Sequence, residues 1–95
     1  MVTGMNSVQL IEKAIIKVGT LSELARVLRW DKSNINSVRK TGKVSPYRAA
    51  QVAELLGTDV VAAYLEAHVE LSLTDHEREF WKVQLAERKK KLKYA

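Results

Sequence analysis

The sequence predicts an all-α domain, compact and built from five to six helices. Apolar residues recur every three or four positions in successive stretches, and a capping residue precedes most of them. The chain holds only 4 Gly and 1 Pro, too few for a loop-rich β-sandwich. Its 95 residues and 46% hydrophobic content suffice for one continuous core, so we expect a single domain spanning residues 1–95.

Several classes of protein are excluded or disfavoured by composition. There is no Cys, which excludes disulfides and thiolate metal sites. No apolar run reaches the roughly 20 residues of a membrane span, and the N-terminus lacks a signal-type pattern, so we expect a cytoplasmic protein that does not enter a membrane. His68 and His76 are the only histidines, and no carboxylate pair stands at ligand spacing. We therefore expect no catalysis, no metal and no cofactor.

The first two helices are predicted over residues 7–18 and 21–28, with Gly19 between them as a left-handed stop. Candidate N-caps are Asn6, Ser7 and Thr20. Glu23, three residues after Thr20, completes a possible capping box. The apolar positions of the second helix form one clean face, made of Leu21, Leu24, Ala25 and Leu28.

The third helix, residues 32–41, carries little apolar surface. Asp31 is its predicted N-cap and Gly42 its stop. Only Ile35 and Val38 are expected to be buried, so Lys, Ser, Asn, Arg and Thr side chains face solvent. A short helix that exposes hydrogen-bond donors in a basic segment suits the major groove of DNA.

Three further helices follow. Ser45 caps the fourth, residues 46–56, and Pro46 takes its first position, where the missing N–H costs little. The fifth is predicted over residues 60–71, and a possible Thr74–Glu77 capping box opens the sixth. The basic segment 88–93 at its end is expected to be solvated and to fray.

Charge divides the chain into two parts. Between residues 26 and 48, seven basic residues face a single acid, Asp31, whereas residues 59–87 contain seven acids and two bases. A localised basic patch favours a polyanion through counterion release, although a merely solvated basic face is the alternative.

The stretch over residues 21–46 resembles the helix-turn-helix domains of the phage lambda-repressor/Cro class. The residues that carry the resemblance are Leu24-Ala25, Asp31, Ile35, Gly42, Pro46 and the segment 53–57. It covers about residues 7–59 and implies a DNA-binding core over residues 7–58, with residues 59–95 as a C-terminal helical extension. The whole chain is also similar to small phage-related regulatory proteins. One position departs from the pattern, because Arg29 stands where the turn usually has Gly, and a positive φ there would cost about 1 kcal/mol. The neighbouring Trp30 is expected to pack in the core.

The resemblance implies a recognition helix that enters the major groove of double-stranded DNA. The expected base-contacting residues are Lys32, Ser33, Asn36 and Ser37. The expected phosphate-contacting residues are Asn34, Arg39, Lys40, Thr41, Lys43, Tyr47 and Arg48.

One recognition helix reads few base pairs, so a homodimer on a near-palindromic operator is expected. The helices of residues 59–95 are expected to form its interface, through Val61, Tyr64, Leu65, Phe80, Trp81 and Leu85. A repressor of the Cro type in a bacterial host is the leading interpretation. Two alternatives remain open: an antitoxin that also binds a protein partner, and an excisionase-like protein that bends DNA.

Overall fold

Six α-helices make up the computed structural model, which describes residues 6–94. They are α1 (Ser7–Val18), α2 (Leu21–Leu28), α3 (Lys32–Thr41), α4 (Pro46–Leu56), α5 (Val60–Leu71) and α6 (Asp75–Tyr94). No strand occurs in the described part, so the predicted all-α class with five to six helices is confirmed. A helix apolar and long enough to cross a membrane is not found between residues 6 and 94.

The core is one cluster of buried side chains contributed by α1 to α5. Leu24, Ile35 and Val52 are almost wholly buried at its centre. Ala63 and Ala67 of α5 also belong to this cluster, because their small side chains let α5 lie close against α4. The buried core therefore extends past residue 58, where the sequence pattern placed the limit of the DNA-binding core.

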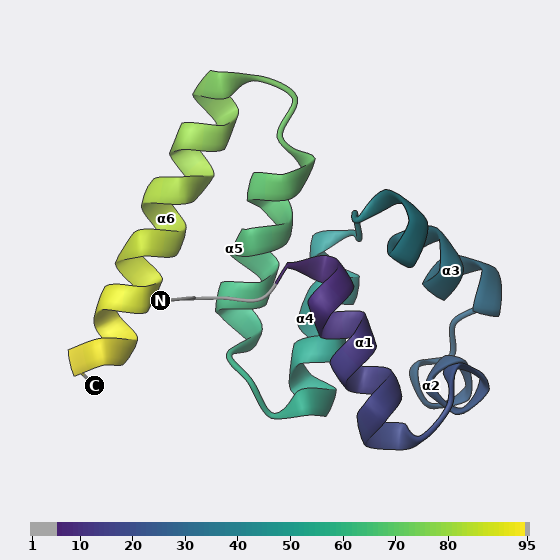
Figure 1. Cartoon of the computed structure of the whole chain (residues 1–95). Coiled ribbons are helices and arrows are strands. Elements are labelled where there is room, and N and C mark those ends of the chain that lie inside the picture. Colours follow the sequence, from purple (N-terminus) through teal and green to yellow (C-terminus); the bar gives the residue numbers. More distant parts are fainter. Residues whose placement is uncertain (1–5, 95) are drawn as a thin grey trace.

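α6 packs against α5 and lies at the opposite end of the molecule from α3 (Figure 1). Its C-terminal half is tied down by Arg88, whose guanidinium makes two hydrogen bonds of 2.9 and 3.0 Å to the carboxylate of Asp59. Asp59 is also the N-cap of α5 and accepts from the Val61 N–H. The basic segment 88–93, expected to fray, is helical.

The helix caps agree with the sequence in position but not always in bonding. Asn6 and Gln9 form a full capping box. Thr20 accepts from the Glu23 N–H, but the Glu23 carboxylate bonds Arg26 instead of completing the box. Asp31 occupies the N-cap position of α3, as predicted, and makes no side-chain cap bond.

The turn between α2 and α3 is built on a non-glycine residue in the left-handed region. Arg29 has φ 62° and ψ 41°, and it is the only non-glycine residue with positive φ in the described chain. In this conformation Cβ crowds the following carbonyl, at a cost of about 1–2 kcal/mol. The departure from the usual turn glycine is therefore accommodated as strain, not by a different turn.

Replacing Arg29 by glycine should relieve this strain. We expect Arg29→Gly to raise the free energy of unfolding by about 0.5–1 kcal/mol, since the relief exceeds the added entropy of a glycine in the unfolded chain. Arg29→Ala, which keeps Cβ, should bring no gain. Urea denaturation of the three chains measures the difference, and equal stability of the two variants would contradict the strain assignment.

The Asp59–Arg88 pair should make stability depend on pH. Hydrogen bonding and charge from Arg88 hold the pKa of the Asp59 carboxyl below its ordinary value of 3.8. A lowered pKa stabilises the fold above pH 3.8 and loses that contribution as the pH falls further. Asp59→Asn, which can still cap α5, should therefore lower the urea midpoint at pH 7, and the difference from the unaltered chain should vanish in acid. Asp75→Asn, at a fully exposed side chain, is the control and should have a much smaller effect.

Candidate nucleic-acid interface

The polar face of α3 is held outward by two buried side chains. Ile35 is 0% exposed and Val38 4% exposed, and both join the core cluster. The other α3 side chains are exposed, except for the partly buried Asn34. All four residues predicted to contact bases lie on this exposed face: Lys32, Ser33, Asn36 and Ser37.

The turn that sets the angle of α3 is anchored by Trp30. Its side chain is buried in the core cluster, as predicted, and its backbone N–H donates to the Ala25 carbonyl at 2.9 Å. The indole Nε1 donates to Oε1 of Gln51 at 3.0 Å, and Nε2 of Gln51 donates to the Leu28 carbonyl at 3.3 Å. Gln51 of α4 thus bridges the end of α2 and the turn.

Arg48 of α4 lies where α3, the turn and α4 meet. Its guanidinium carbon is 5.1 Å from the centroid of the Trp30 ring. With the Asn34 amide oriented to satisfy both groups, its oxygen accepts from Nη2 and Nη1 of Arg48 at 3.1 and 3.3 Å. Both partners are uncharged, so Arg48 keeps its positive charge beside the exposed face of α3. Asn34, which the sequence assigned to phosphate contact, therefore contacts Arg48 within the chain.

Arg39 is engaged elsewhere in the fold. Its Nε donates to the Glu12 carboxylate of α1 at 2.8 Å. The pair is solvent-exposed and therefore weak, but it neutralises part of the charge that the sequence assigned to phosphate contact. The sequence did not predict this pairing.

The hydroxyl of Thr41 makes two hydrogen bonds to the backbone at the C-terminal end of α3. Thr41 Oγ1 donates to the Ser37 carbonyl at 2.8 Å and accepts from the Lys43 N–H at 3.2 Å. The side chains of Lys40 and Lys43, before and after Thr41 in the sequence, are exposed. Tyr47, in the first turn of α4, is 71% exposed.

The six residues expected at a dimer interface are not equally accessible. Val61, Tyr64 and Phe80 are exposed, whereas Leu65 and Trp81 are partly buried. Leu85 is only 8% exposed, because it lies on the side of α6 that packs against α5. Its assignment to an intermolecular surface was wrong, and it belongs to the packing within one chain.

Two supporting residues, Gln51 and Glu12, were missed in the sequence. A buried Trp N–H needs an acceptor, which indicates that a partner exists but not which residue supplies it.

Residues 6–94 contain no cluster of three His, Asp or Glu side chains arranged to hold a metal ion.

Gln51 offers a test of how the turn is held. Gln51→Leu should lower the free energy of unfolding by about 1–3 kcal/mol, since it leaves the Trp30 N–H and the Leu28 carbonyl without their partners. Gln51→Glu keeps the acceptor and should lose less. Urea denaturation followed by tryptophan fluorescence measures both, and an unchanged stability in the leucine variant would contradict the bridging role.

We compared the chain with known proteins, and no family model, curated protein or solved structure matches it.

Proposed function

We propose that the chain is a sequence-specific regulator that binds double-stranded DNA in the bacterial cytoplasm, with α3 in the major groove. The observation that supports this most is the outer face of α3, which carries only polar and basic side chains on a helix attached by Ile35 and Val38. A face of this kind has no apolar surface for a protein partner, and it matches the donors and acceptors of base edges.

The side chains along α3 suit two kinds of contact. Lys32 donates to guanine O6 and N7, Asn36 pairs with adenine N6 and N7, and the two serines bond to either base. Exposed Lys40 and Lys43 lie toward the far end of the helix, where they meet phosphates. Arg48, oriented by Asn34 and Trp30, supplies a phosphate contact with little loss of side-chain entropy.

We further propose a regulator of the lambda-repressor/Cro type that works as a dimer. Two copies on a near-palindromic operator double the number of base pairs read, which one short helix cannot supply alone. The turn between the two short helices supports this family, because Arg29 adopts there the left-handed conformation that the usual turn glycine adopts easily.

Two substitutions on α3 separate base reading from phosphate binding. Asn36→Ala should weaken binding to the selected site by about 1–3 kcal/mol and relax one base position. Lys40→Ala should weaken binding to all sequences alike and reduce the salt slope by about 1. Selection from random DNA identifies the site, and mobility shifts over a salt series measure both variants.

Lys82→Ala is the matched lysine control, because Lys82 lies on α6, away from α3 (Figure 1). It should leave affinity nearly unchanged. Equal, sequence-independent losses in the Asn36 and Lys40 variants would contradict base reading, and an unaltered chain with no preference among DNA fragments would overturn the proposal.

A further inference from the structure

The face of α6 that points away from α5 carries an apolar centre. Phe80 and Val83 are each 54% exposed, and at 100° per residue they lie roughly opposite the buried Leu85. A shallow hollow opens beside them, lined by His76, Glu79, Phe80, Val83 and Gln84 of α6 alone. Exposed apolar side chains clustered in this way are typical of a contact surface.

Packed aromatic rings connect this face to α5. The Phe80 ring meets the edge of Trp81 at 5.0 Å, Trp81 stacks on His68 of α5 at 4.0 Å, and His68 meets Tyr64 at 4.8 Å. A row of rings therefore runs from α5 to the outer face of α6. The ring of Phe80 is supported from the side and stays exposed on the surface.

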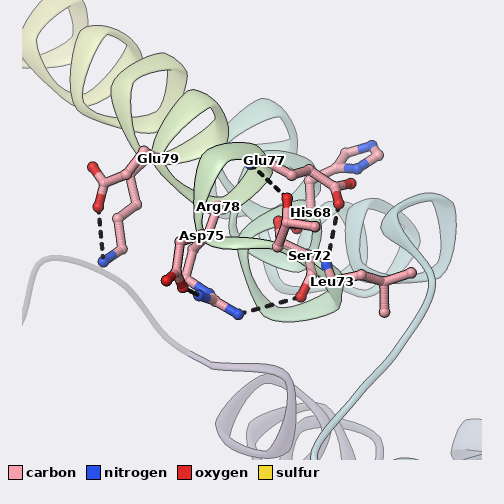
Figure 2. A network of polar contacts seen from close by, with 9 residues as sticks. His68, Ser72, Leu73, Asp75, Glu77, Arg78 and Glu79 are labelled. Carbon is pink, nitrogen blue, oxygen red and sulfur yellow. Dashed lines mark hydrogen bonds and ion pairs between the residues drawn. The ribbon is translucent and has the colours of Figure 1, made fainter.

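The connection between α5 and α6 is equally well fixed, as Figure 2 shows. Arg78 donates to Asp75 at 2.7 Å and to the Ser72 carbonyl at 3.3 Å, while the Ser72 hydroxyl donates to the His68 carbonyl. The Glu77 carboxylate accepts from the Leu73 N–H at 3.1 Å. α6 is thus set against α5 before any partner arrives, and a partner that fits its outer face pays little for ordering it.

The spacing along this face suits a second helix. Exposed side chains follow one another at intervals of four and three residues: His76, Phe80, Val83, Glu87 and Lys90. This alternation is the seam of a two-helix coiled coil. Only Phe80 and Val83 are apolar, so the seam has one centre.

Charge selects the occupant and its direction. Beside the apolar centre, the exposed polar residues of the seam are His76 on one side and Glu87 and Lys90 on the other. A parallel second copy would bring Glu87 against Glu87 and Lys90 against Lys90. An antiparallel copy with Phe80 against Val83 brings His76 of each helix to Glu87 of the other, where the imidazole can donate to the carboxylate, and it also opposes the two helix dipoles favourably.

We infer that the outer face of α6 binds the same face of a second copy of this chain, with the two α6 helices antiparallel and Phe80 of each copy against Val83 of the other. This surface is self-complementary, as a two-fold interface must be. This pairing rests on the proposed function and names the surface through which the proposed dimer forms. It is tested without DNA, so that its failure and a failure of DNA binding are distinguished.

Sedimentation of the whole chain from low micromolar to submillimolar concentration tests the pairing. One pair of helices forms a small interface, so we expect a dimer with a dissociation constant on the order of micromolar. Phe80→Glu and Val83→Glu should each raise that constant by about tenfold or more. Ile16→Glu, at a 79% exposed apolar residue of α1, is the matched control and should leave it unchanged, and circular dichroism checks that all variants fold.

Cysteine cross-linking tests the direction, because the chain has no cysteine of its own. In the antiparallel pair, His76 of one copy lies near Glu87 of the other, and the two copies of either residue are too far apart for a disulfide. A mixture of His76→Cys and Glu87→Cys should therefore cross-link, and neither variant should do so alone. Cross-linking of each variant alone would show a parallel pair and overturn the inference. A chain that stays monomeric, or a dimer unaffected at Phe80 and Val83, would also overturn it.

Discussion

The burial of Ile35 and Val38 is the contact on which the placement of α3 depends. A ten-residue helix of this composition has little stability in water by itself, and no other α3 side chain is buried. Packing of these two residues in the core therefore forms the helix and also decides which of its faces remains outside. The strained Arg29 and the Trp30–Gln51 bridge complete the constraint by setting where α3 begins.

The sequence was most informative where the chemistry is local. The third and fourth helices have the bounds that were predicted, and Gly19, Gly42 and Gly57 each end a helix. Caps, glycine stops and apolar spacing act within one or two turns, so a linear reading captures them. The exposure of α3 followed from the same periodicity, since two apolar positions in ten leave most of the helix polar.

Contacts between distant parts of the chain were not predictable in this way. Gln51 meets a residue 21 positions away, and Glu12 meets one 27 positions away. In the sequence, the apolar spacing of Leu85 is the same as that of an exposed interface residue. Periodicity identifies an apolar face but not what covers it. Only the packing of α6 on α5 decides that Leu85 lies inside and Phe80 outside.

The position of α3 and α6 at opposite ends of the molecule limits how a pair could meet a duplex. One copy measures 36 Å in its longest dimension, close to the length of one DNA turn of about 34 Å. In the proposed pair, two copies joined through the outer face of α6 would hold their α3 helices at the far ends of the assembly, more than one turn apart. The half-sites of the proposed operator would then be widely separated, with the neighbouring groove left empty between them.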